Sequence, residues 1–157
     1  MGAPEYYVLL VDDDASLLET MKEILEGRGY CVDTSQTASD ALKKFKERYY
    51  DVVVIDMVLP DKPGTELLRE LETSRIPRVR KIVLTGHASL ENAVQALNLG
   101  ADAYLLKPVQ PDDLISAIAD QIEKQKQEIQ LIQKKIMLFI ERDFEKKIRR
   151  LEEEKYL

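Results

Sequence analysis

The sequence predicts an α/β fold, a doubly wound parallel sheet in which five strands alternate with five helices. From Tyr6 to Leu106, short runs rich in β-branched residues alternate with amphipathic segments, which is typical of βαβ units. Most of these runs are continuously apolar, as in strands that helices cover on both faces. After Pro111, glycine and proline are absent, and apolar residues continue at helical spacing to the end of the chain.

The predicted strands are short and consist mainly of valine, isoleucine, leucine and tyrosine. The first, third, fourth and fifth runs predict strands that are covered on both faces, whereas the shorter second run predicts an edge strand. We expect the five strands near Tyr6–Val11, Cys31–Thr34, Val52–Ile55, Lys81–Leu84 and Ala103–Leu106.

Four helices are predicted between and around these strands. The first has apolar residues at helical spacing from Leu17 to Leu25 and ends before Gly27. For the fourth, Ser89 is a suitable N-cap and Gly100 a suitable C-terminal stop. The second, third and fourth helices are expected over Ala38–Tyr49, Gly64–Leu71 and Leu90–Leu99.

The fifth predicted helix runs from Pro111 to the end of the chain and carries one apolar stripe. At about 1.5 Å per residue it would be roughly 70 Å long, so only its first turns can pack on a domain of this size. Gln125 interrupts the stripe, which consists of Ile115, Ile118, Ile122, Ile129, Ile132, Ile136, Ile140, Phe144, Ile148 and Leu151.

The later part of this stripe predicts self-association. We expect it to form a homodimeric coiled coil, because an apolar seam outside the domain needs a partner helix. From Ile129 on, the spacing approaches an eleven-residue repeat, which favours a straight or slightly right-handed pair. The alternative is a solvated helix, or one that folds back on its own domain. We therefore divide the chain into a domain over residues 1–122 and a helical extension over residues 123–157.

Composition and charge exclude several classes of protein. The net charge of −6 and the pI near 5.0 argue against general affinity for nucleic acid or anionic membranes. Basic pairs at Lys146-Lys147 and Arg149-Arg150 are followed by acidic residues, which indicates a solvated helix face. No run is long and apolar enough for a membrane span, so we expect a soluble, cytoplasmic protein. The lone Cys31 cannot form an internal disulfide and is interpreted as a small strand residue.

Polar side chains follow four of the predicted strands at the point where each strand ends. Asp12, Asp13 and Asp14 follow the first, Asp56 the third, Thr85 the fourth and Lys107 the fifth. Because the carboxyl ends of parallel strands meet at one crevice, these side chains should converge there. This combination of groups predicts a phosphoryl-transfer site.

The acidic residues predict a magnesium site. Two carboxylates about 4 Å apart repel each other by roughly 4 kcal/mol at an effective dielectric near 20, and a hard divalent cation removes that cost. Mg²⁺ suits carboxylates, carbonyls and phosphate oxygens, whereas zinc or copper does not suit this set. Asp56 could then attack an activated phosphoryl group, with Lys107 and Thr85 contacting its oxygens. For one residue of Asp12–Asp14, capping of the following helix is an equal alternative.

Four ordered motifs resemble a known family. Leu-Leu-Val-Asp-Asp-Asp, Val-Val-Val-Ile-Asp-Met-Val-Leu-Pro-Asp-Lys-Pro-Gly, Ile-Val-Leu-Thr-Gly and Tyr-Leu-Leu-Lys-Pro look like the receiver domain of two-component response regulators. The resemblance covers roughly Tyr6 to Ile122. It implies a flavodoxin-like sheet with strand order 2-1-3-4-5, and a switch protein rather than an enzyme, apart from slow self-dephosphorylation.

The resemblance also implies roles for individual residues. Asp56 would accept a phosphoryl group from a histidine kinase. The magnesium ligands would be Asp12, Asp13 and Asp56, together with the backbone carbonyl of Val58.

Further residues would bind the phosphoryl group or change conformation in response to it. Lys107 would contact the phosphate, and the Lys107-Pro108 peptide bond would be cis. Thr85 and Tyr104 would form a switch that responds to the charge added at Asp56 and changes the conformation or dimer geometry. His87 lies where side chains of this family affect loss of the phosphoryl group, but a plain surface histidine is the preferred interpretation.

Three alternatives compete with this interpretation. Asp12-x-Asp14-x-Ser16 loosely matches the nucleophile loop of haloacid-dehalogenase-like phosphatases, although Asp56 would then have no role. A purely structural dimer module would leave the set of polar strand ends unexplained. The chain could also be the receiver and linker of a larger transcription activator. The cognate kinase and the downstream effector cannot be read from the sequence.

Overall fold

The computed structural model of the chain describes residues 5–72, 74–87 and 89–157. In these ranges, strands and helices alternate as the sequence predicts. The strands are β1 (Tyr7–Val11), β2 (Cys31–Ser35), β3 (Val52–Asp56), β4 (Arg80–Thr85) and β5 (Ala103–Leu106). The helices are α1 (Ala15–Gly27), α2 (Ala38–Glu47), α3 (Gly64–Glu70), α4 (Leu90–Asn98) and α5 (Pro111–Lys155).

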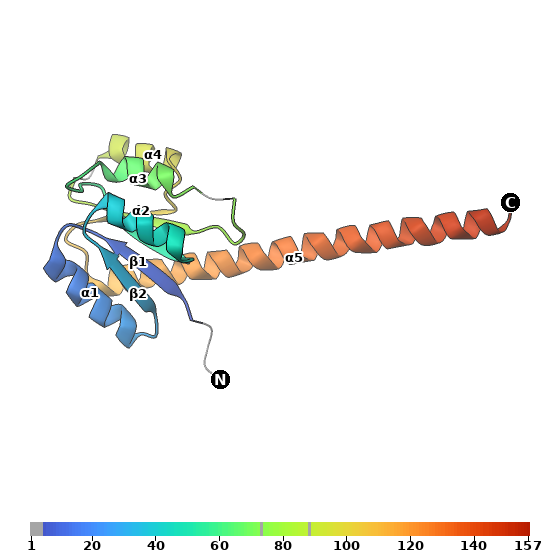
Figure 1. Ribbon diagram of the computed structural model, residues 1–157, viewed down its shortest axis with the longest axis horizontal. Helices are drawn as coiled ribbons and strands as arrows, with labels where there is room; N and C mark the ends of the chain where they lie inside the picture. The colour runs from blue at the N-terminus through green and yellow to red at the C-terminus, as the bar shows by residue number, and fades with distance from the viewer. Residues whose placement is uncertain (1–4, 73, 88) are drawn as a thin grey trace.

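The five strands form one parallel sheet in the order β2-β1-β3-β4-β5, which confirms the predicted fold class. Helices cover both faces, with α1 and the first part of α5 on one side and α2, α3 and α4 on the other (Figure 1). β1 shows why the central strands read as continuous apolar runs. Its Val8 and Leu10 pack toward α1 and α5, whereas Leu9 and Val11 pack toward α2 and α3.

One expectation about the sheet was wrong. The continuous apolar run of the fifth strand predicted burial on both faces, but β5 is only partly buried and Leu106 is 51% exposed. The strand order explains the difference, because β5 pairs with β4 alone and forms an edge of the sheet, as β2 does at the other side.

The helix ends follow local signals in the sequence. The Ser89 side chain accepts a hydrogen bond from the Asn92 backbone N–H and caps α4, as predicted. Gly100, just after α4, has a φ of +100°, a conformation that favours glycine. α2 ends at Glu47 rather than at the predicted Tyr49, because the backbone of Arg48 is extended.

The long helix α5 packs on the domain only through its first turns. Beyond Ile132 every described residue is exposed, and the helix projects from the domain as a rod (Figure 1). Gln125 interrupts the apolar stripe in sequence but not the packing, since it is 3% exposed. Its amide nitrogen donates to the Tyr49 hydroxyl and to the Arg78 carbonyl, both at 3.2 Å.

Within the described part of the chain, no helix combines the length and the apolar character that crossing a membrane requires.

Candidate functional site

The carboxyl ends of the strands bring the predicted polar residues to one edge of the sheet. Val11 of β1 is in register with Ile55 of β3, so Asp12 and Asp56 follow directly on neighbouring strands. On the other side of β3, Asp56 is in register with Leu84, the residue before Thr85. Lys107 comes directly after β5, and its backbone N–H donates to the Thr85 carbonyl at 2.7 Å.

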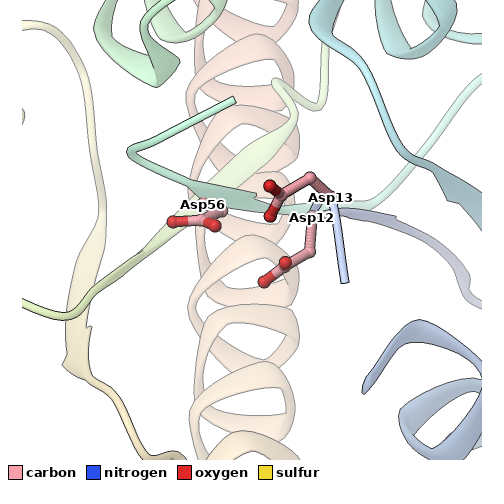
Figure 2. A group of neighbouring side chains, drawn as sticks. All are labelled: Asp12, Asp13 and Asp56. Carbon is pink, nitrogen blue, oxygen red and sulfur yellow. The ribbon is translucent and has the colours of Figure 1, made fainter. Parts of the chain in front are cut away.

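Three carboxylates form the acidic part of the site. Asp12, Asp13 and Asp56 each contribute an oxygen atom, and these atoms lie within 4.8 Å of one another (Figure 2). Asp12 and Asp56 are 2% and 6% exposed, whereas Asp13 is exposed to solvent. An all-oxygen set with one solvent-facing side suits Mg²⁺, which keeps several waters when it binds to proteins.

Lys107 neutralises part of this charge. Its Nζ atom lies 2.6 Å from Asp12 Oδ2 and 3.1 Å from Asp56 Oδ2. The ammonium group therefore bridges the two buried carboxylates. The peptide bond between Lys107 and Pro108 is cis.

The pKa values at the site reflect burial and these hydrogen bonds. Burial raises the pKa of Asp56 above its ordinary value, and the hydrogen bonds from Lys107 and from the Val58 N–H offset only part of this effect. Burial lowers the pKa of Lys107, but its hydrogen bonds to Asp12 and Asp56 outweigh that effect and leave the pKa raised. The ammonium form of Lys107 is thus held firmly between the two acids.

The loop after β3 is held close to Asp56. The Val58 backbone N–H donates to Asp56 Oδ1 at 3.2 Å, and Val58 forms an isolated bridge with Pro63. Gly64 follows, and a Cβ atom there would lie 2.3 Å from the Asp56 carbonyl oxygen. Only glycine allows this approach. The sequence contains the glycine, but nothing in its neighbours reveals that the loop folds back onto Asp56.

Thr85 and Tyr104 meet at the backbone of His87. The Thr85 hydroxyl accepts a hydrogen bond from the His87 N–H at 3.1 Å and donates to the His87 carbonyl at 3.3 Å. The Tyr104 hydroxyl donates to the same carbonyl at 3.3 Å. Sequence reasoning singled out the imidazole of His87, which is exposed, and missed its carbonyl, because a backbone acceptor has no signature in the sequence.

Asp14 lies outside the acidic group. It is exposed, and its side chain caps α1 by accepting a hydrogen bond from the Leu17 N–H at 3.1 Å. Its own N–H donates to Asp12 Oδ1 at 2.9 Å. Capping therefore accounts for Asp14, which weakens the comparison of Asp12-x-Asp14 with a phosphatase nucleophile loop.

Comparisons with known proteins agree with this geometry. The family model described as response regulator receiver domain matches residues 8–119. The alginate biosynthesis transcriptional regulatory protein AlgB of Pseudomonas putida is 34% identical over 116 residues, which are 74% of this chain and 26% of that protein. The chain spans between about a quarter and three fifths of the length of the curated relatives it matches.

Two solved structures show the same fold. One is a CheY-like response regulator receiver domain protein from Methanospirillum hungatei, with 43% identity and a TM-score of 0.75 over 80% of this chain and 99% of that one. The other is the beryllofluoride-activated NtrC4 receiver domain dimer, with 35% identity and a TM-score of 0.70 over 76% of this chain and 98% of that one.

Proposed function

The chain belongs to the response regulator receiver domain family, and from that membership we propose that Asp56 accepts a phosphoryl group from a histidine kinase. One observation carries the proposal: Asp56 is buried at the end of β3, within 4.8 Å of two further carboxylates and in contact with Lys107. In this step an Asp56 oxygen attacks the phosphorus of a phosphohistidine. The new P–O bond forms as the P–N bond breaks, and the imidazole leaves.

Mg²⁺ is the cofactor that receiver domains bind at an acidic pocket, and the donor set here fits that ion. We assign Asp12, Asp13 and Asp56 as its ligands, with the Val58 backbone carbonyl as a fourth. When bound, the ion supplies positive charge that offsets the charge of the incoming phosphoryl group. The exposed position of Asp13 allows the ion to reach the site from solvent.

Lys107 and Thr85 would bind the oxygens of the phosphoryl group. Lys107 already donates to Asp56, so its ammonium needs only a small movement to contact a phosphate there. The Thr85 hydroxyl must first release the His87 carbonyl, its acceptor in this structure. Because Tyr104 shares that acceptor, a change at Thr85 reaches Tyr104 through one backbone group. A shift from 1% to 99% active would need roughly 5.5 kcal/mol in favour of the active state.

We further propose that residues 1–122 form the receiver domain and that the extension over residues 123–157 joins two copies in a homodimer. The apolar stripe continues from Ile129 to Leu151, and past Ile132 the domain leaves it exposed. Phosphorylation would then change dimer geometry or affinity. The relatives that this chain matches are longer than it, so a receiver-linker unit of a larger regulator is a second candidate.

Phosphorylation of the intact chain tests the central proposal. After incubation with acetyl phosphate and Mg²⁺, we expect the mass of one added phosphoryl group in the mass spectrum, and its loss on acid or base treatment. Asp56→Asn should abolish the addition. Equal labelling of that variant would contradict the assignment, and steady turnover of a generic phosphate ester would favour a phosphatase.

A further inference from the structure

The middle of α5 carries apolar residues on every side of the helix. Five consecutive apolar residues run from Ile136 to Ile140, and each is between 47% and 73% exposed. Leu131 is also exposed to solvent, over 54% of its surface. Eight of the twelve residues from Ile129 to Ile140 are apolar. This fraction exceeds the two positions in seven that a coiled-coil seam uses and the three in seven typical of a helix in a bundle.

Two leucines lie opposite the seam that a partner helix would cover. At 3.6 residues per turn, Leu138 is about 160° around the helix from Ile136, and Leu131 about 140°. The two leucines are seven residues apart and so lie on one line, which we call the back face. A second helix packed against Ile132, Ile136 and Ile140 leaves the back face in water.

The domain of the same chain does not cover the back face. The ion pair of Glu128 with Arg80 joins α5 to the domain at a point before either leucine. Beyond Ile132, every residue of α5 is exposed. Whatever covers the leucines therefore comes from outside this protomer.

The charge of the extension favours further copies of this chain. Residues 123–157 carry ten basic and eight acidic side chains, whereas the whole chain has a net charge of −6. The extension is thus close to neutral, and its acidic and basic residues are interspersed. Several copies can lie side by side without a large accumulation of like charge.

We propose that two α5 dimers pack through their back faces into a four-helix bundle, so that the chain assembles as a tetramer. The proposal rests on the homodimer proposed above and adds a second interface to it. Apolar residues all round the helix suit a bundle, in which each helix has two close neighbours. The four receiver domains would lie outside this bundle, since the two leucines follow the Glu128–Arg80 ion pair and every residue beyond Ile132 is exposed.

The experiment is a mass measurement by sedimentation equilibrium on the full chain over a wide concentration range. We expect four times the chain mass of 18.0 kDa. Leu131→Gln with Leu138→Gln should halve this mass to that of a dimer. Lys134→Gln is the matched control, because Lys134 lies between the two leucines on the back face, and it should leave the tetramer intact. Ile136→Gln with Ile140→Gln, on the seam, should take the mass below that of a dimer.

Circular dichroism should show unchanged helix content in the leucine variant, and phosphorylation at Asp56 should be retained, since the back face lies far along α5 from the site. A wild-type mass of two chains at every concentration would overturn the tetramer and leave the homodimer standing. A mass of one chain would overturn both, and a mass of three would overturn the pairing of dimers. A leucine variant that still weighs four chains would show that the back face is not the second interface.

Discussion

Arg80 and Glu128 form an ion pair that joins the first residue of β4 to α5 at the point where the helix leaves the domain. Arg80 is only 8% exposed and also lies 3.5 Å from Asp102. One turn earlier, Gln125 donates to the Arg78 carbonyl. β4 therefore carries the anchor of α5 at its amino end and Thr85 at its carboxyl end, so a change in this strand can reach both.

Glu128→Gln should weaken the attachment of α5. Arg80 would lose a charged partner while staying buried, although Asp102 still compensates part of its charge. We expect a loss of about 1–2 kcal/mol in the free energy of unfolding, less than for a fully buried pair because Glu128 is one-third exposed. Hydrogen exchange should speed up over residues 121–132. Glu123→Gln, an exposed position on the same helix, is the control. Equal exchange rates in both variants would contradict the role of Glu128 in attaching α5 to the domain.

Asp56→Asn should stabilise the fold at neutral pH. Folding raises the pKa of Asp56, chiefly through burial. A carboxyl of this kind stabilises the fold below its unfolded pKa, near 3.8, and loses that contribution as the pH rises through its raised folded value. The amide variant avoids this loss. We expect a gain of about 1–2 kcal/mol at pH 7, since Lys107 offsets part of the roughly 4 kcal/mol repulsion between two close carboxylates.

Urea unfolding at several pH values, without divalent cation, measures this effect. The advantage of Asp56→Asn over the wild type should shrink as the pH falls toward 3.8. Adding Mg²⁺ at neutral pH should also reduce it, because the ion stabilises the wild-type carboxylates. A variant that is less stable than the wild type at pH 7 in the absence of Mg²⁺ would contradict the prediction.

The fold and the acidic site could be predicted from the sequence because both depend on local patterns. Apolar runs that end in Asp12, Asp56, Thr85 and Lys107 gave the strands and their common edge. Three features could not be read from local patterns. The partial burial of β5 depends on its place at the edge of the sheet, which periodicity does not show and which only the strand order implied by the resemblance contains. The burial of Gln125 depends on Tyr49 and Arg78, which are distant in sequence. The shared acceptor of Thr85 and Tyr104 is a backbone carbonyl.

Thr85→Ala should separate binding of a phosphate mimic from the response to it. The change removes both hydrogen bonds between Thr85 and the His87 backbone but leaves the three carboxylates in place. We expect beryllofluoride with Mg²⁺ still to bind, with affinity reduced about tenfold for one lost hydrogen bond. The chemical shifts of Tyr104 should no longer respond. Thr85→Ser, which keeps the hydroxyl, should restore the response, and a full response in Thr85→Ala would contradict this role.

Tyr104→Phe tests the second hydrogen bond to the His87 carbonyl, the one that the Tyr104 hydroxyl donates. It removes only the hydrogen bond to the His87 carbonyl, at the surface, so the free energy of unfolding should fall by less than about 1 kcal/mol. Phosphorylation at Asp56 should proceed at the wild-type rate, because the Tyr104 hydroxyl donates to the His87 carbonyl and not to a carboxylate of the site. The change in assembly on adding beryllofluoride, followed by small-angle scattering, should weaken. An undiminished change would exclude the Tyr104 hydroxyl from the switch.

Lys107→Met should move stability and magnesium affinity in opposite directions. Without the ammonium, the buried carboxylates of Asp12 and Asp56 lose the cation that lies 2.6 Å and 3.1 Å from them. We expect the free energy of unfolding without divalent cation to fall by about 2–4 kcal/mol. Mg²⁺ no longer competes with a resident positive charge, so its affinity, measured by calorimetry, should rise about tenfold.

Binding of beryllofluoride to Lys107→Met should weaken even so, because the lysine is a proposed phosphate ligand. Lys62→Met, at a partly exposed ion pair with Glu70, is the control and should change none of the three quantities by a comparable amount. Weaker magnesium binding in Lys107→Met would mean that Lys107 organises the acidic site rather than competing with the ion.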